Sequence, residues 1–332
     1  MLTTTMFATT TVRSALVAAL AGAVAMAASP AEAQSYPSSN VKLIVPVPAG
    51  GVTDRMARIV AQGLMEMWGQ SVIVENRPGG NLAVGAQAVA RSPADGYTLL
   101  AAPDSTMTAN PHLMSKLPYE IKDFTPIIVL CRATPVLVVN NAFPAKSVRE
   151  LIALAKEKPG ALNYGSPGVG TYSHLSMEDL KQKTGTSIVH VPYRGGAPAQ
   201  TAIIAGEVSM LLLNLSSIEQ HEKAGQVRIL AAAGETRPAA RPDLPTVAEA
   251  GVPGFSTSAW FALWGPANMP AELVAKLHAD VAKVLDTPQT KAFFETNSFE
   301  RVRLSPAQFG DLIERDFKHW GALIKAVGAK VE

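Results

Sequence analysis

Cysteine is almost missing from the sequence, since Cys131 is the only one in 332 residues. A single cysteine forms no intrachain disulfide, so the fold must depend on its hydrophobic core, which a chain of this length is able to bury. Cys131 lies too far from the N-terminus to be a lipid-attachment site. We expect it to be a small buried hydrophobe within a strand.

Charged side chains are scarce as well. They make up 17% of the chain, the net charge is +2, and Lys and Arg form no cluster. A protein that binds nucleic acid or a charged membrane surface carries a basic patch. We therefore expect neither kind of partner.

The sequence also lacks the common signatures of catalysis and of cofactor binding. Its six histidines form no H-x-H or H-E-x-x-H pattern and there is no cysteine pair, which argues against a zinc site. The segment around Ser166 resembles a nucleophile elbow, but Tyr164 stands where that motif needs glycine. No dinucleotide or P-loop glycine pattern is present. We expect no catalytic residue, metal or cofactor; a hydrolase that uses Ser166 with a histidine is the weaker alternative.

Only one long apolar run occurs, and it lies near the N-terminus. Ser14 to Ala28 is almost wholly apolar, follows Arg13, and precedes the A-x-A pattern Ala31-Glu32-Ala33. These are the three parts of a secretory signal peptide, which we assign to residues 1–33. A membrane anchor is less favoured because the run is shorter than the roughly 20 residues that span a bilayer. Cleavage leaves 299 residues (332 − 33), enough for about two domains.

Short apolar runs alternate with helical patterns along the rest of the chain, which predicts an α/β protein. Several runs are nearly continuous in Val, Ile and Leu, as in strands buried on both faces of a mostly parallel sheet. The expected strands are Val41–Val45, Val72–Val74, Tyr97–Ala101, Ile127–Leu130, Val136–Val139, Leu162–Tyr164, Ile188–Val191, Val208–Leu213, Ile229–Ala233 and Trp260–Leu263.

Helix starts are marked by capping boxes, in which a Ser or Thr is followed three residues later by Glu or Gln. Ser147, Thr246 and Ser305 each begin one. The helix after Ser305 carries an apolar stripe that we assign to the core. Its members are Phe309, Leu312, Ile313, Phe317, Trp320, Ile324 and Val327.

Two glycine-rich turns share one arrangement. The first turn, Pro46–Asp54, and the second turn, Gly165–Thr171, each lie between an expected strand and a helix. Glycine lets backbone N–H groups approach a ligand, and the first N–H groups of a helix have no partner within it. A helix N-terminus also favours an anion. Either turn alone is compatible with an ordinary strand–helix connection, but two opposed turns would hold a carboxylate through main-chain atoms.

Several longer motifs extend this interpretation, and with them the sequence resembles the extracytoplasmic receptors of tripartite tricarboxylate transporters, the Bug-type proteins. They span the chain after the signal in the family's order. The matching stretches are Val41–Pro46 with Gly50, Gly51, Asp54, Ala57 and Arg58, then Val74–Gly80, Asp95–Leu100, Leu117–Tyr119 with Asp123 and Phe124, His190–Tyr193, and Leu244–Gly251.

The resemblance implies a two-lobed periplasmic-binding-protein fold of type II, a Venus flytrap with two hinge crossings. One lobe would be residues 34–132 plus 256–332 and the other residues 133–255, with the two glycine turns on opposite lobes. The ligand-binding candidates that follow are Val47, Gly50, Gly51, Thr53, Ser166, Gly168, Gly170 and Thr171, and in second place Asp104, Ser105, His174, Tyr193 and Asn214. His174 has an equal claim to a capping or core role, and Tyr193 to packing at the hinge.

Two departures from the family's pattern bear on the ligand. Val47 stands where relatives usually have an aromatic residue, and Asn214 stands where many have Asp. Without that acidic group an amino-acid ligand is disfavoured, so we expect a di-, tri- or aromatic carboxylate. The resemblance further implies a monomeric periplasmic receptor that works with membrane permease subunits. A sensor that presents its ligand to a membrane signalling kinase is the alternative.

Overall fold

The computed structural model describes residues 36–238 and 240–331. The predicted signal peptide lies outside these residues, so its cleavage stays a prediction. Of the N-terminal unit, residues 36–39 are described and contain a cis peptide bond between Tyr36 and Pro37. Within the described ranges, no helix combines the length and the apolar character needed to cross a membrane.

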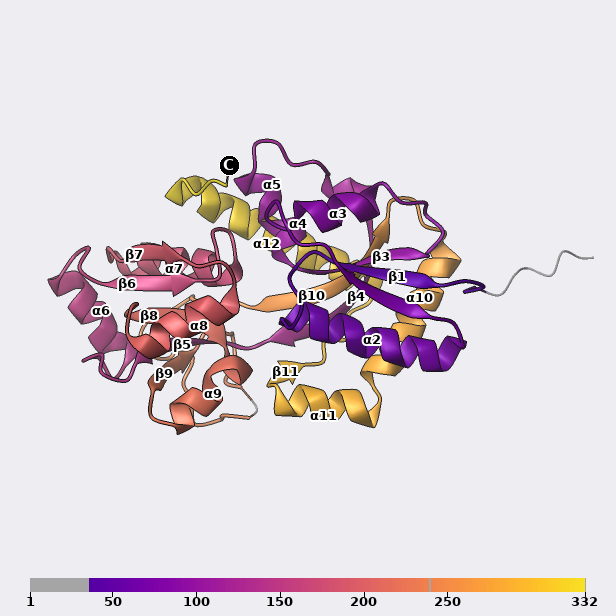
Figure 1. Cartoon of the computed structure of the whole chain (residues 1–332). Helices are drawn as coiled ribbons and strands as arrows, with labels where there is room; N and C mark the ends of the chain where they lie inside the picture. The colour runs from indigo at the N-terminus through magenta and orange to yellow at the C-terminus, as the bar shows by residue number, and fades with distance from the viewer. Residues whose placement is uncertain (1–35, 239, 332) are drawn as a thin grey trace, which may run out of the picture. The chain divides into compact units, whose positions relative to one another are not determined.

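The first of two sheets has six strands, which lie side by side in the order β11-β4-β10-β3-β1-β2 (Figure 1). β1 pairs in parallel with β2 and β3, whereas β10 runs antiparallel to β3 and β4. The strands are β1 (Val41–Val45), β2 (Val72–Asn76), β3 (Thr98–Pro103), β4 (Phe124–Ala133), β10 (Ala259–Pro266) and β11 (Phe299–Glu300).

The long helices of this lobe each bury one apolar stripe. In α2, Met56, Val60 and Leu64 are fully buried at helical spacing. The indole rings of Trp260 and Trp264 form part of the core beneath α12. The helices are α2 (Val52–Trp68), α3 (Ala83–Ala90), α4 (Ser105–Thr108), α5 (Asn110–Leu113), the 3₁₀ helix η1 (Ile121–Asp123), α10 (Ala271–Leu285), α11 (Pro288–Thr296) and α12 (Pro306–Val327).

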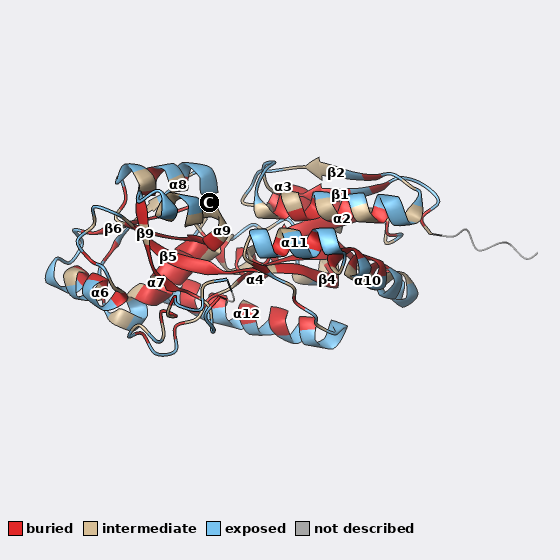
Figure 2. Ribbon diagram, turned by 90° about the horizontal axis from the view of Figure 1, so that it is seen from below, coloured by how far each residue is buried: buried red, intermediate tan, exposed pale blue. Residues whose placement is uncertain are grey.

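The second sheet has five strands in the order β7-β6-β8-β5-β9. Both faces of this sheet are covered, and alternate residues of β5 point to opposite faces. Leu137 and Val139 belong to one apolar cluster, and Val136 and Val138 belong to another. Figure 2 shows β5 as mostly buried. The elements are β5 (Pro135–Asn140), α6 (Val148–Glu157), β6 (Asn163–Ser166), α7 (Tyr172–Thr184), β7 (Val189–Pro192), α8 (Gly196–Ala205), β8 (Met210–Asn214), α9 (Leu215–Lys223) and β9 (Val227–Ala232).

The chain passes between the sheets twice. It leaves the first sheet at the end of β4, crosses at Thr134 into β5, and returns between β9 and β10. The two-lobed fold with two hinge crossings is therefore confirmed. The expected lobe limits at residues 132/133 and 255/256 remain a proposal.

A third connection between the lobes is made by packing instead of by the chain. Leu175 of α7 is 1% exposed and joins a cluster formed by Leu113 of α5 and by Trp320, Leu323 and Ile324 of α12. Burial of an apolar side chain of this size contributes about 1.5–3 kcal/mol. This cluster ties the helix after the second turn to the lobe that carries the first turn.

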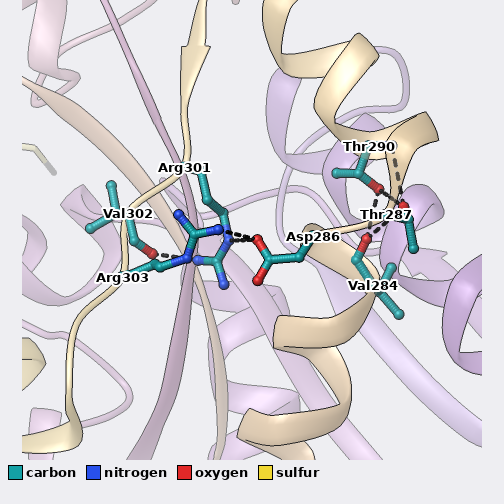
Figure 3. A network of polar contacts seen from close by, with 7 residues as sticks. All are labelled: Val284, Asp286, Thr287, Thr290, Arg301, Val302 and Arg303. Atoms are coloured by element: carbon teal, nitrogen blue, oxygen red, sulfur yellow. Dashed lines mark hydrogen bonds and ion pairs between the residues drawn. The ribbon is translucent and has the colours of Figure 1, made fainter.

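A polar network fixes the far edge of the first lobe (Figure 3). Asp286, which follows α10, accepts hydrogen bonds from Arg301 Nε at 3.3 Å and from Arg303 Nη2 at 2.7 Å. Thr287 caps α11, and its hydroxyl lies 2.9 Å from that of Thr290. The segment after β11 is thereby held against the turn between α10 and α11.

Most expected strands are confirmed with ends displaced by one to three residues, and Cys131 is fully buried in β4 as expected. The burial of the Cys131 thiol raises its pKa. The capping box at Ser305 is also confirmed. The expectation of mostly parallel sheets was wrong: both sheets are mixed, because the strands next to the hinge run antiparallel.

One expected helix is absent from its place. Thr246 and Glu249 do form the reciprocal bonds of a capping box, at 2.8 and 3.1 Å. However, the described residues that follow make a single turn and no helix. The glycine at position 251 (φ +121°) and Pro253 end the turn before a second one can form.

Candidate functional site

The first turn connects the end of β1 at Val45 to the start of α2 at Val52, as expected. Gly50 has φ +94°, a conformation that L side chains rarely adopt. Side chains built at Gly50 and Gly51 would meet nothing within 4 Å, so the space in front of both is open.

A single carboxylate supports this turn from behind. Asp54 is 2% exposed; its Oδ2 accepts from the Gly50 N–H and Arg58 Nε, and its Oδ1 from Arg58 Nη2 and Asn76 Nδ2, all within 3.0 Å. Burial acts to raise the pKa of Asp54, but the hydrogen bonds and the charge of Arg58 outweigh it, so the pKa is lowered. Asn76 also donates to the Val47 carbonyl at 3.0 Å. The turn is therefore held in one shape by a charged group with no acceptor position to spare.

The start of α2 leaves its donors free. Within the described residues, the N–H groups of Gly51, Val52, Thr53 and Asp54 have no hydrogen-bond partner. These are the unpaired donors that every helix has at its start. Here they lie beside open space at Gly50 and Gly51, which suits an approaching anion.

The second turn connects the end of β6 at Ser166 to the start of α7 at Tyr172. Thr171 is the N-cap, and its hydroxyl accepts from the His174 N–H at 3.4 Å. Gly168 (φ +146°) and Gly170 (φ +82°) both adopt positive φ. The expected strand–turn–helix order is thus present at both places.

The N–H groups of this turn are mostly used within it. Gly168 N–H donates to Ser166 Oγ at 3.2 Å, Gly170 N–H to His174 Nδ1 at 3.1 Å, and Thr171 N–H to the Gly168 carbonyl at 3.4 Å. In the part of the chain that the structure describes, the N–H groups of Val169, Tyr172 and Ser173 have no partner. The second turn lies where the sequence predicted it, but the amides of its named glycines Gly168 and Gly170 already have acceptors.

A stack of three rings lies behind the second turn. The His190 ring lies 4.8 Å from that of Tyr164 and 4.3 Å from that of His174. His190 Nε2 lies 2.6 Å from Ser166 Oγ, and Tyr164 donates its hydroxyl to Glu178 at 2.5 Å. Burial lowers the pKa of His174, and burial followed by the neighbouring His174 lowers the pKa of His190 to about 4. Both imidazoles are therefore neutral at pH 7.

The Ser166–His190 pair is the contact that a hydrolase would need, but its third member is missing. No carboxylate among the described residues bonds to His190, because Glu178 is engaged by Tyr164 and Lys181. Ser166 Oγ already accepts from Gly168 N–H. The pair holds the turn together and lacks the acid that orients a catalytic histidine.

The second-place candidates Asp104, Ser105 and Asn214 gather around Tyr172. The Tyr172 hydroxyl donates to Asn214 Oδ1 at 3.0 Å. Burial and, after it, the nearby Asp104, which is 3% exposed, raise the pKa of Tyr172. Ser105 N–H donates to Asp104 Oδ1 at 2.8 Å. Burial and, after it, the charge of Asp316 raise the pKa of Asp104 to about 8, so this carboxyl group is protonated at neutral pH.

The second turn also contacts the other lobe directly. A side chain built at Gly170 would lie 2.3 Å from Leu113 Cδ1 and 3.7 Å from Asn81 Nδ2. Only glycine fits this approach. Leu113 and Asn81 were not found by sequence reasoning, because a contact between distant segments has no local signature.

Tyr193 lies behind the second turn. Its N–H donates to the Ser166 carbonyl at 2.9 Å, and its ring packs against Gly165 while its hydroxyl donates to Glu207 at 3.5 Å. Tyr193 therefore supports the strand end. His190, Asp54 and Asn76 were missed as site residues, although all three lie in the motifs that carried the resemblance.

The structure thus makes two clusters of the candidates. Val47, Gly50, Gly51 and Thr53 belong to the first turn; the others lie in or around the second. Two cavities, of about 470 Å³ beside α11 and about 270 Å³ beside α10, are lined by none of the candidate residues. In the described ranges no group of three or more His, Cys, Asp or Glu is placed to hold a metal ion.

Comparison with known proteins agrees with this architecture. Residues 56–329 match the family model of the tripartite tricarboxylate transporter family receptor, TctC. BugT of Bordetella pertussis is 32% identical over 312 residues, which cover 93% of this chain and 96% of that protein.

Two solved structures from Rhodopseudomonas palustris are also similar. Rpa4515, solved with adipate, has a TM-score of 0.82 at 35% identity and is matched over 89% of this chain and all of that one. MatC, solved with bound malate, has a TM-score of 0.78 at 28% identity, over 87% of this chain and all of that one.

These relatives are solute-binding receptors and not enzymes, in agreement with the missing catalytic acid beside His190. The family resemblance drawn from the motifs is confirmed: the chain belongs to the tripartite tricarboxylate transporter receptor family, with the Bug-type proteins among its relatives.

Proposed function

We propose that this receptor is exported to the periplasm, where it captures a small di-, tri- or aromatic carboxylate and delivers it to the permease subunits of a tripartite transporter. The observation that carries this proposal is the row of free N–H groups at the start of α2, from Gly51 to Asp54, beside open space. Support comes from the two relatives solved with adipate and with malate, which are both dicarboxylates.

The charges around the first turn favour an anion held by the main chain. Asp54 is the nearest acid, but four hydrogen bonds occupy its two oxygens, two of them from Arg58. A helix dipole contributes about 0.3–1 kcal/mol to such binding when exposed and up to about 2 kcal/mol when partly buried. Micromolar affinity needs about 8 kcal/mol. Most of the affinity must therefore come from direct hydrogen bonds in a site from which water is excluded.

The second turn supplies the opposing surface in this proposal. The free N–H groups of Val169, Tyr172 and Ser173 belong to a helix start of the other lobe, and the neutral Asp104 lies beside Tyr172. A protonated carboxyl group does not repel an anion and is able to donate a hydrogen bond to it. With Asn214 in place of an acid, the site has no charged partner for a ligand amine.

A thermal-shift panel on the mature chain tests the proposal. Adipate, malate, citrate and benzoate are compared with adipamide, which has the same body as adipate but no charge. A ligand at about 100 times its Kd stabilises the folded state by about 2.7 kcal/mol. We expect a shift with at least one carboxylate and none with adipamide. Equal shifts with adipate and adipamide, or no shift with any carboxylate, would overturn the proposal.

A further inference from the structure

The second turn depends on two imidazoles, and the geometry of the His174 contact specifies a protonation state. Gly170 N–H is a donor and His174 Nδ1 lies 3.1 Å from it, in a buried position. Nδ1 accepts this bond only when it carries no proton, which makes His174 the neutral tautomer with its proton on Nε2. The bond therefore exists only in the uncharged ring.

Protonation of His174 places a second donor against the Gly170 N–H. The bond then breaks, and the Gly170 amide, which is buried against Leu113, has no acceptor left. A buried N–H group without a partner is costly. Because Gly170 lies between the strand end and the N-cap Thr171, the loss of this bond changes the path of the whole turn.

His190 makes the effect stronger. Its ring is stacked on His174 with centroids 4.3 Å apart, so two imidazolium rings would place like charges face to face. The groups that face this pair are Tyr164 from β6 and Glu178 and Lys181 from α7; Glu178 favours the charged rings and Lys181 opposes them. Glu178 is itself paired with Lys181 at 2.7 Å, which reduces its effect.

We propose that His174 and His190 are positioning residues that keep the second turn in its ligand-binding shape only while both rings are neutral, so that acidification weakens carboxylate binding. This inference rests on the proposed function. His174 thus acts through Gly170 and not by touching the ligand.

The direction of the pH effect follows from the lowered pKa values of both rings. A histidine with an unperturbed pKa near 6.5 is favoured as the neutral form in the folded turn, where the pKa of His190 is about 4. Its contribution to the turn is complete above pH 6.5 and is lost as the pH falls toward 4. An acidic medium would therefore weaken carboxylate binding.

Variants that keep each hydrogen bond but cannot be protonated test the inference. In His174→Asn, Oδ1 takes the position of the acceptor Nδ1, and in His190→Gln the side-chain amide, which both donates and accepts, takes the position of Nε2 beside Ser166 Oγ. We expect the double variant to bind adipate or malate at pH 7.5 within threefold of the wild type. Calorimetric titration at pH 7.5 and 4.5 should then show the wild-type Kd rising at least threefold more than that of the double variant. Because both proteins meet the same ligand, protonation of the ligand cancels.

His221→Asn is the matched control. His221 is a partly exposed histidine of α9, and its Nδ1 lies 2.6 Å from Gln226 Oε1. Its substitution should leave the wild-type pH dependence unchanged. His174→Leu, which keeps no acceptor, should lose affinity at least tenfold already at pH 7.5. Equal pH dependence in the wild type and the double variant would overturn the inference.

A readout without ligand separates this inference from the proposed function. Long-range ¹H–¹⁵N spectra of the mature chain should show His174 with its proton on Nε2 at pH 7.5 and titrating below pH 6.5. If no carboxylate of the thermal-shift panel binds at pH 7.5, the proposed function fails, and the spectra still test whether the second turn depends on neutral His174. A proton on Nδ1 of His174 would contradict the inference whatever the ligand.

Discussion

The two glycine turns are built on the same plan with different chemistry. In each, the N–H of a glycine with positive φ donates to the side chain four residues later, in the first turn of the following helix: Gly50 to Asp54 and Gly170 to His174. The acceptor is a carboxylate in the first turn and a neutral imidazole in the second. The Asp54 carboxylate is therefore charged at all ordinary pH values, whereas the His174 imidazole accepts its bond only while Nδ1 carries no proton.

The difference extends to the N–H groups that are left for a ligand. In the first turn the Gly50 N–H is bonded, and the next four N–H groups have no partner among the described residues. In the second turn the N–H groups of Gly168, Gly170 and Thr171 are bonded within the turn and its helix. The second turn also touches the opposite lobe at Leu113, and the first faces open space. Similar glycine spacing thus gives a row of exposed N–H groups in the first turn and close packing against Leu113 in the second.

Gly170→Val should have the largest effect, because it adds a steric clash to an unfavourable φ. Strain at a non-glycine residue costs about 1–3 kcal/mol and overpacking about 1–3 kcal/mol. We expect the free energy of unfolding to fall by about 3 kcal/mol and ligand binding to be lost, measured by urea denaturation and by thermal shift. Gly185→Val is the control, since Gly185 has φ +63° but nothing within 4 Å of a built side chain. Equal losses in the two variants would show that the contact with Leu113 does not matter.

Asp54→Ala should remove the side chain that holds the first turn and lower the free energy of unfolding by about 2 kcal/mol. Four hydrogen bonds to the carboxylate disappear, but Arg58 is half exposed and recovers water, which limits the loss. Glu66→Ala, which removes an exposed acid that bonds Gln62, should stay within about 0.5 kcal/mol. The measurement is again urea denaturation. A loss as small as that of the control would mean that the turn keeps its shape without Asp54.

Asp104→Asn, a change beside the helix that follows the second turn, should alter how the free energy of unfolding depends on pH. The pKa of Asp104 is raised to about 8, so its stabilising contribution is complete below pH 3.8 and is lost as the pH rises through 8. One such group changes the free energy of unfolding by at most about 1.4 kcal/mol per pH unit. The asparagine variant should flatten the fall in unfolding free energy between about pH 4 and 8. An unchanged curve would show that Asp104 is ionised in the folded protein.

Sequence patterns predicted the parts of the fold that local forces determine. Both glycine turns, α7 and the cap at Ser305 follow from glycine, capping residues and helical spacing within a few positions. The antiparallel strands at the hinge were missed, because strand direction depends on where the chain crosses between lobes. The helix predicted after Thr246 was wrong although the local signal was real. The capping bonds are present, but Gly251 and Pro253 end the turn before a helix forms.

The candidate site was predicted at the level of segments and not of atoms. The Ser166–His190 contact joins β6 to β7, and the Gly170–Leu113 approach joins two lobes, so neither leaves a spacing to recognise. In contrast, the bonds from Gly50 to Asp54 and from Gly170 to His174 are local. A glycine followed four residues later by an acceptor at a helix start is a signal that sequence inspection is able to find.

Gly51→Ala gives the smallest expected effect on stability and the sharpest test of the first turn. Gly51 has φ −75° and ψ 175°, which alanine adopts freely, and a side chain there meets nothing within 4 Å. Unfolding free energy should therefore stay within about 0.5 kcal/mol of the wild type. If a carboxylate lies against the N–H groups at the start of α2, the added methyl group blocks its approach and raises Kd. Gly310→Ala, at a position in α12 where a side chain also meets nothing, is the control for the affinity measurement. Unchanged affinity in Gly51→Ala would place the ligand away from the first turn and leave the second turn as the anion-binding surface.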